Sequence, residues 1–434
     1  MKKILLSLFL FFSCYAGISY PQNSDEIQKG AANQYPTGDI TKICEEKIKN
    51  YCRGLVDPGE IKDKQLRDLV IEIKNYVFDI YEKNNSIDWS THYKKVLTDL
   101  RDICIKAGIA SAVDWTVNYA DGFCMQFNLN YLGRHGLYFD MTFFAYDNRL
   151  TASFLLARDA GQYGMPRYID IPDPYNVRVR VDRVLLNNFY ISDKFFAEGI
   201  GGTSTYVMTK QKSPVIYDSP LIIHNLDRYY NDGVYIFFDL FKLLELHDIN
   251  IREKKFLDNA DAYCVFGTLP ENRVLEYKLN YRAWRDEYLK AILENGEERE
   301  QVDAFAKKYT DYAISSSDIH EAAHILKPPD NFSSEALIQF EVDALMVALL
   351  SSPDIFKELS TLLRGYYSSY AKQTAEISVS EVLTIVARGY ADLLKGKNLL
   401  NLKERSNDLF KVLEGIDRLS SGDIGIIKQK ILNQ

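Results

Sequence analysis

The sequence predicts an α+β protein in which a helical N-terminal region and a predominantly helical C-terminal region flank a β-rich, antiparallel middle. Three observations predict this class. Apolar residues recur every three or four positions in residues 66–103, the spacing of helices with one buried face. Residues 113–239 instead contain short runs rich in Tyr, Phe, Val and Thr, separated by Gly, Pro, Asn and Asp. From about residue 240 onward the helical spacing returns.

The first residues have the layout of an export signal. Two Lys residues precede an almost wholly apolar run at residues 4–12, which is too short to span a bilayer permanently. Cys14 follows Phe-Phe-Ser and resembles the lipobox Cys that is lipidated in bacterial lipoproteins. The alternative is cleavage after Ala16 or Gly17, small residues that suit signal cleavage, with release of a secreted soluble protein. We therefore expect an exported protein, either a cell-envelope lipoprotein attached to the membrane only through Cys14 or a secreted soluble protein.

Composition limits the organisation and the partners of the chain. The 47% hydrophobic content is ample for packed cores, and the formal charge of −8 comes without any Lys/Arg-rich block that would favour nucleic acid. No second apolar run is long enough for an internal membrane span. We expect five segments: a leader at 1–14, a flexible linker at 15–41, a helical region at 42–112, a β-rich domain at 113–239 and a helical domain at 240–434.

Two helices are expected in the helical region. Their buried faces would be formed by Leu66, Leu69, Val70, Ile73, Tyr76, Val77 and Ile80, and by Tyr93, Val96, Leu97, Leu100 and Ile103. The Cys residues after Cys14 form no Cys-x-x-Cys pair, so a thiolate zinc site is not expected. Export permits disulfides, for which Cys44–Cys52 and Cys104–Cys124 are candidates, and the pairing stays open.

The middle of the chain is expected to form an antiparallel sheet. Alternation of Val and Arg over residues 177–181 predicts a strand with one apolar face. Strands are expected at 122–131, 136–146, 150–156, 176–184, 203–208 and 233–238. The abundant Tyr could mark a carbohydrate- or peptide-binding face, although aromatic residues in strands mostly fill cores. His135 and His224 lie in this region and are not assigned to a site.

One motif carries chemistry, the run His320-Glu321-Ala322-Ala323-His324. Residues four apart lie on one face of a helix, so both His side chains can present a ring nitrogen to the same cation. By this H-E-x-x-H pattern the sequence resembles zinc metallopeptidases. The resemblance implies Zn²⁺ as cofactor, His320 and His324 as ligands, Glu321 as the base that activates water, and a protein or peptide substrate.

The helix that carries the motif is expected to be short. Helices at 280–295 and 297–312 should precede it, and residues 315–318, Ser-Ser-Ser-Asp, offer several N-cap candidates. Two Pro residues after Lys327 should end it. These limits leave a helix of about three turns with both His near its middle.

A zinc site needs a third protein ligand, and the following helix offers Glu341. This residue falls on an apolar stripe with Leu337, Ala344 and Ala348, so its carboxylate should point into the packed interior. Burying a lone carboxylate costs several kcal/mol unless a cation or hydrogen-bond donors meet it. Glu335 lies instead in the first turn, where a carboxylate commonly serves the helix N-terminus in solvent. We expect Glu341 to be the ligand.

The segment Glu341-Val342-Asp343-Ala344 makes the resemblance more specific, to the gluzincin type, whose third ligand is a Glu on the helix after the motif. The resemblance implies a zincin-like C-terminal domain. Asp343 would either orient a motif His or cap a neighbouring group. Zincins also stabilise the oxyanion with a Tyr or His, and the candidates here, which could instead simply pack between the C-terminal helices, are Tyr366, Tyr367, Tyr370 and Tyr390.

Further helices are expected near 353–372, 378–394, 402–419 and 424–432, where they would wall the cleft. Two functions of different classes fit these observations. The first is a zinc peptidase at the cell envelope or outside the cell. The second is a non-catalytic envelope binding lipoprotein in which the Tyr-rich sheet is the working surface and the metal site is structural or vestigial. The motif does not specify the substrate.

Overall fold

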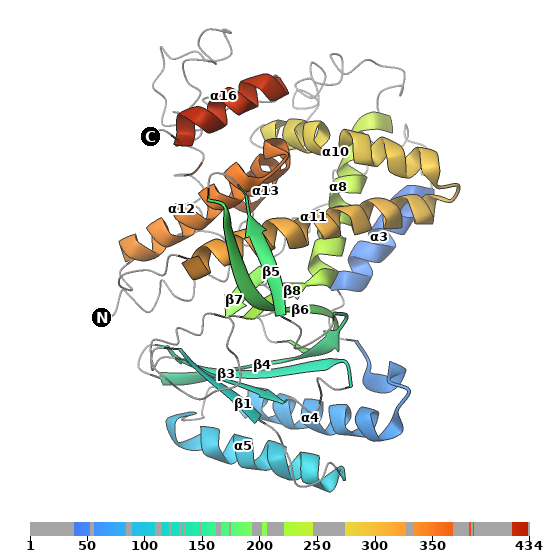
Figure 1. Ribbon diagram of the computed structural model, residues 1–434. Coiled ribbons are helices and arrows are strands. Elements are labelled where there is room, and N and C mark those ends of the chain that lie inside the picture. Colours follow the sequence, from blue (N-terminus) through green and yellow to red (C-terminus); the bar gives the residue numbers. More distant parts are fainter. Residues whose placement is uncertain are drawn as a thin grey trace. The chain divides into compact units, whose positions relative to one another are not determined.

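The computed structural model describes residues 39–52, 56–83, 89–108, 115–120, 124–129, 132, 135–146, 149–161, 166–172, 175–192, 202–205, 221–245, 274–326, 334–367, 382, 385 and 419–432. It shows a mixed α+β protein, as the sequence predicts (Figure 1). The chain divides into two compact units. Among the described residues, the first comprises those within 56–169 and 178–227, and the second comprises those within 39–52, 170–177 and 228–432.

The first unit is built on a sheet. The strands of the sheet are β1 (Trp115–Ala120), β2 (Cys124–Leu129), β3 (Leu137–Tyr146), β4 (Arg149–Asp159), β5 (Pro166–Ile171), β6 (Val177–Ser192), β7 (Gly202–Thr205) and β8 (Leu221–Asn225), of which the end of β5 and the first residue of β6 are assigned to the second unit. They follow the order β1-β2-β3-β4-β6-β8-β7, and β5 pairs with β6. The pairs β1–β2, β2–β3, β3–β4, β4–β6 and β7–β8 are antiparallel, whereas β6 and β8 are parallel. Antiparallel pairing therefore holds for most of this sheet.

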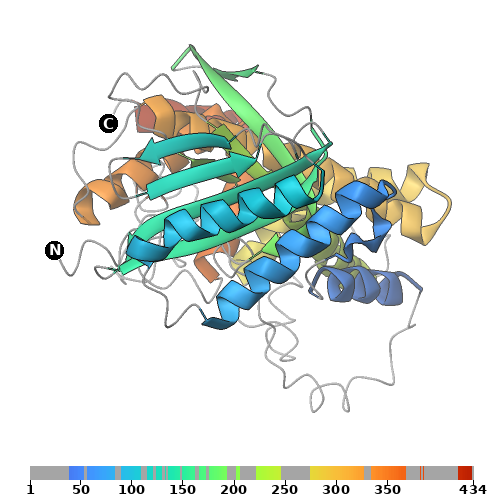
Figure 2. The same ribbon diagram turned by 90° about the horizontal axis from the view of Figure 1, so that it is seen from below.

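Two helices cover one face of that sheet. The short 3-10 helix η2 (Pro58–Glu60) precedes α4 (Lys64–Lys83), and α5 (Trp89–Lys106) follows. Figure 2 shows α4 and α5 side by side against the strands. The faces expected from the periodicity are buried there, with Leu69, Ile73 and Leu100 packed in one cluster with Phe139 and Phe154 of the sheet. Their apolar surface drives this packing.

The second unit is helical. It contains α3 (Asp39–Cys52), α8 (Leu226–Glu245), α10 (Val274–Glu294), α11 (Glu298–Leu326), α12 (Ser334–Ser351), α13 (Ile355–Tyr367) and α16 (Ser421–Leu432). Its core is centred on Trp284, which lies 5.0 Å from the Tyr309 ring and 5.9 Å from the Phe305 ring. Among the described residues, no helix is long and apolar enough to cross a membrane.

The N-terminal helices divide between the two units. The region expected at 42–112 contributes α4 and α5 to the first unit and α3 to the second. Lys47 on α3 pairs with Asp303 of α11 and donates to the Tyr230 hydroxyl of α8 at 2.9 Å. Neither Cys44 nor Cys104 forms a disulfide, and both are buried.

The prediction of a strand at 233–238 is wrong, because these residues belong to the helix α8. The run Gly-Val-Tyr-Ile-Phe-Phe is too uniformly apolar to separate the two periods by itself. The buried side chains show the helical period. Val234, Phe237 and Phe241 are buried at the three-and-four spacing of a helix, and so are Ile236 and Leu240. The helix therefore packs its apolar face into the core of the second unit.

The close approach of α8 to α11 predicts an unusual response at Gly233. A Cβ at this position would lie 2.8 Å from the Ala306 Cα and 3.0 Å from the Tyr309 Cβ. Gly→Ala in a helix normally stabilises by about 1 kcal/mol, but this steric overlap should instead lower the free energy of unfolding by about 1–3 kcal/mol. Denaturant unfolding measures the change. Gly425→Ala on α16, where a Cβ meets nothing within 4 Å, is the matched control and should be neutral or stabilising.

Candidate metal centre

The motif lies in the second half of a single long helix. The structure has no break at residues 315–318, so the expected separate helix of about three turns is wrong: α11 runs unbroken for 29 residues from Glu298 to Leu326. Ser and Asp favour caps because their side chains compete for backbone groups. Here Ser316 hydrogen-bonds to Glu358 instead, and Asp318 is buried. Tertiary contacts therefore replace the local capping role.

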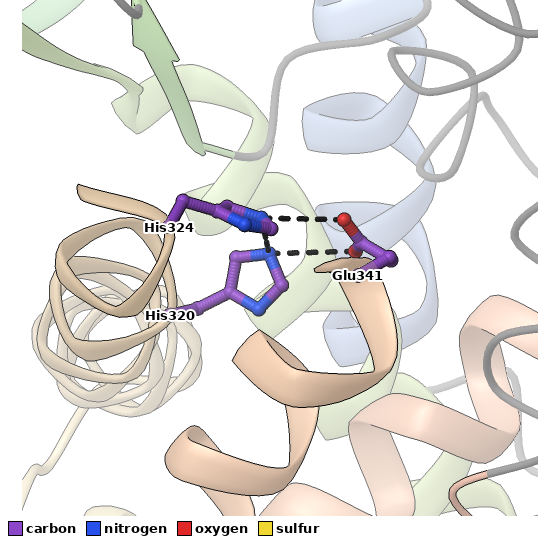
Figure 3. Close-up of side chains that lie close together, drawn as sticks. All are labelled: His320, His324 and Glu341. Atoms are coloured by element: carbon purple, nitrogen blue, oxygen red, sulfur yellow. Dashed lines mark hydrogen bonds and ion pairs between the residues drawn. The ribbon is translucent and has the colours of Figure 1, made fainter. Parts of the chain in front are cut away.

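His320 and His324 lie one turn apart on α11 and face the same point. Their Nε2 atoms are 3.1 Å apart, and their rings are nearly perpendicular at 87° (Figure 3). The His324 ring also lies 4.1 Å from the ring of Phe340 on α12, which restricts its orientation. Their side chains are only 17% and 7% exposed, respectively, so these imidazoles do not form a solvated surface pair.

The structure brings Glu341, and not Glu335, to the two imidazoles. One carboxylate oxygen of Glu341 lies 3.4 Å from the His320 Nε2, and the other lies 3.2 Å from the His324 Nε2 (Figure 3). Glu335 is exposed in the first turn of α12. Because α11 and α12 pack against each other, residues on two helices converge on one site.

These three side chains could hold a metal ion. Ligands about 2.0–2.1 Å from a tetrahedral ion are separated from one another by about 3.3 Å. The three facing distances, 3.1, 3.2 and 3.4 Å, are close to that value, and the two that involve Glu341 are to different oxygens of its carboxylate. Two imidazole nitrogens and a carboxylate oxygen are also the donor set of several zinc hydrolases. The residues present thus fit a metal in both spacing and chemistry.

The two imidazoles and the carboxylate shift one another's pKa values, and only a neutral imidazole can bind a metal. Burial lowers the pKa of His320, and only part of this effect is offset by the charge of Glu341. Burial acts on His324 in the same sense, but the hydrogen bond and charge of Glu341 outweigh it and raise the pKa of His324. The two His side chains lower the pKa of Glu341 although burial opposes this. Glu341 is therefore ionised, as a metal ligand must be.

Glu321 is buried next to the ligands. The residue is 6% exposed, and its charge opposes the lowering of the His320 pKa by burial and adds to the raised pKa of His324. The Glu321 side chain therefore lies close enough to act electrostatically on a metal ion bound by the two imidazoles.

The other expected site residues are less defined. Asp343 accepts a hydrogen bond from Gln339 at 2.7 Å, and its role toward a motif His stays a prediction. Tyr366 and Tyr367 lie in the last turn of α13. Tyr370, Tyr390 and Cys14 lie outside the described residues. The assignment of an oxyanion stabiliser and of a lipidated Cys therefore stays a prediction as well.

A second buried carboxylate, Glu358 on α13, lies outside the set of residues expected from the sequence. It accepts a hydrogen bond from the Tyr312 hydroxyl at 2.6 Å and is 6% exposed. The signal was present, because Glu358 falls among Ile355, Leu359 and Leu362 on a helical stripe. The reasoning that selects Glu341 would have selected Glu358 too.

Glu358 predicts a pH dependence of stability. Burial raises its pKa to about 7, although hydrogen bonds from Tyr312 and Ser316 oppose the shift. The folded state therefore holds a proton that the unfolded chain releases at lower pH, so stability should fall as pH rises from about 4.5 to about 7. This contribution is of order 3 kcal/mol. Denaturant unfolding at several pH values in this range measures the free energy of unfolding, which should fall less steeply with pH in Glu358→Gln than in wild type. Equal slopes in the two proteins would contradict the raised pKa of Glu358.

Comparisons with known proteins identify no relative. No family model matches the chain, and no match was found among curated proteins or among solved structures. The resemblance to zinc metallopeptidases thus remains a prediction from the H-E-x-x-H motif, and the function of the site has to be inferred from its own residues.

Proposed function

We propose that this protein is a zinc-dependent peptidase that hydrolyses amide bonds outside the cytoplasm, at the cell envelope or after secretion. The observation that carries the proposal is the convergence of His320, His324 and Glu341 within the distances given above. A structural zinc site normally has four protein ligands, whereas hydrolytic sites use three and leave one position for water or substrate. Among the described residues, three ligands converge here, which favours the hydrolytic type.

Three residues would bind the ion and a fourth would transfer protons. His320, His324 and Glu341 would hold the ion, which supplies Lewis acidity that acidifies water and polarises the scissile carbonyl. Glu321 would accept the proton of the attacking water and pass it to the leaving nitrogen. Because Glu321 adjoins His320 on the same helix, the base and the ligands are positioned together. The rigidity of α11 therefore serves both binding and proton transfer.

The metal assignment predicts which substitutions remove zinc. Purified wild type should bind about one zinc ion per chain, and His324→Ala or Glu341→Ala should weaken binding by at least about 100-fold, more than an outer-shell residue contributes. Zinc content and chelator competition measure this. His135→Ala and Glu335→Ala, which change an exposed His and an exposed Glu, are matched controls and should bind as wild type does. Wild-type protein that binds no zinc would refute the assignment.

The catalytic assignment predicts a separation of binding from turnover. Glu321→Gln should retain zinc but lower cleavage of a broad mixture of unstructured peptides by about 10²–10⁴-fold, because the amide cannot take the proton. Mass spectrometry of the peptide products measures cleavage. Cleavage that persists at the wild-type rate would exclude Glu321 as the base. Zinc binding without any cleavage by wild type would instead favour the non-catalytic binding protein.

A further inference from the structure

The two halves of α11 are held by different kinds of contact. In the first half, Val302, Phe305 and Tyr309 are buried in the apolar core. Between residues 310 and 326 the buried side chains are small or polar, namely Asp318, Glu321, Ala322, Ala323 and His324. No large apolar side chain in this half is fully buried. Tyr312 and Ala313 still pack against the core while partly buried, so apolar packing holds the ligand-bearing half less completely than the first half.

A polar cluster lies beside this half of the helix. Tyr312 and Ser316 precede His320 by two turns and one turn on the same side of α11, and both hydrogen-bond to Glu358 of α13. Burial and the nearby Glu358 raise the pKa of Tyr312 well above its usual value, so its hydroxyl keeps its proton and donates. The Tyr312 ring is held edge-to-face by Trp284 at 5.2 Å. The Glu358 side chain therefore hydrogen-bonds to two successive turns of α11.

The same cluster reaches the end of the helix that carries Glu341. Ser352, directly after α12, acts on the Tyr312 hydroxyl, while its own hydroxyl donates to the Asp354 backbone oxygen at 2.9 Å. Lys428 of α16 donates to the backbone oxygen of Leu350 at 3.1 Å and to that of Ser352 at 2.6 Å, where a cation complements the helix C-terminus. The Lys428 charge also acts on Glu358, as does that of Asp354. Contacts within this cluster thus connect both ligand-bearing helices.

We propose that Glu358 is a positioning residue for the metal centre. By holding Tyr312 and Ser316, it fixes the rotation and depth of α11, and so the placement of His320 and His324 opposite Glu341. The inference rests on the proposed metal centre. A buried hydrogen-bond acceptor suits this task because hydrogen bonds constrain distance and direction, whereas apolar contacts tolerate rotation and sliding. Ligands held in place before the metal arrives bind it more tightly.

The test is the dissociation constant for Zn²⁺ of the full-length protein, measured by chelator competition. Tyr312→Phe keeps the ring against Trp284 and removes only the hydroxyl, and it should weaken zinc binding roughly tenfold, the lower limit for loss of a group that directly orients a ligand. Glu358→Ala should weaken it at least as much. Glu358→Gln retains an oxygen that accepts from both hydroxyls, so it should bind zinc nearly as wild type does.

Ser360→Ala is the control for a general loss of stability. The Ser360 hydroxyl donates to Asn280 of α10 at 2.5 Å, a buried hydrogen bond of α13 that does not involve α11. This variant should lower the free energy of unfolding without changing zinc affinity. If wild type binds zinc and Tyr312→Phe binds it equally well, the positioning role is wrong while the metal centre stands. If Ser360→Ala or Glu358→Gln weakens zinc binding as much as Tyr312→Phe does, the positioning role of Glu358 is also wrong. If wild type binds no zinc, both the metal centre and the positioning role are wrong.

Discussion

The site depends on the burial of one carboxylate opposite two imidazoles. Glu341 has only 12% of its side chain exposed, and each of its oxygens faces a different His Nε2 atom. An ionised carboxylate is expensive to remove from water, so a partner of opposite charge must accompany it. Protons on the imidazoles can meet that need in part, but burial disfavours the charge on His320. A divalent cation would satisfy all three groups at once.

The helices of the second unit provide the frame for this arrangement. The apolar cluster around Trp284 anchors the first half of α11, and the uninterrupted helix carries His320 and His324 beyond it. α12 supplies Glu341 from the adjacent helix. Polar contacts among α11, α13 and α16 occur where apolar packing of α11 is weakest. The apolar core thus anchors the first half of α11, and the polar cluster holds the half that carries the two His ligands.

Much of the site could be predicted because its determinants are local. A separation of four residues places His320 and His324 on one face of any helix, and the apolar stripe around Glu341 indicates a buried acid. The buried faces of α4 and α5 follow from the same periodicity. These predictions need only the geometry of a helix, because the spacing of residues in the sequence determines which side chains share a face.

Other features could not be predicted because they depend on distant partners. The Ser-rich segment before the motif looks like a cap until Glu358, more than forty positions away, takes the hydrogen bond of Ser316. The apolar run of α8 fits a strand as well as a helix until its contact with Ala306 on α11 is known. The parallel pairing of β6 with β8 likewise joins segments that no local pattern relates. Tertiary context decides each of these cases.

The most direct test of the central claim is the zinc K-edge X-ray absorption spectrum of the purified protein. Coordination by His320, His324 and Glu341 predicts a first shell of nitrogen and oxygen at about 2.0–2.1 Å, with outer-shell scattering from two imidazoles. The imidazole signal should fall in His324→Ala. A sulfur shell at about 2.3 Å, or imidazole scattering that is unchanged in His324→Ala, would place zinc elsewhere and contradict the account.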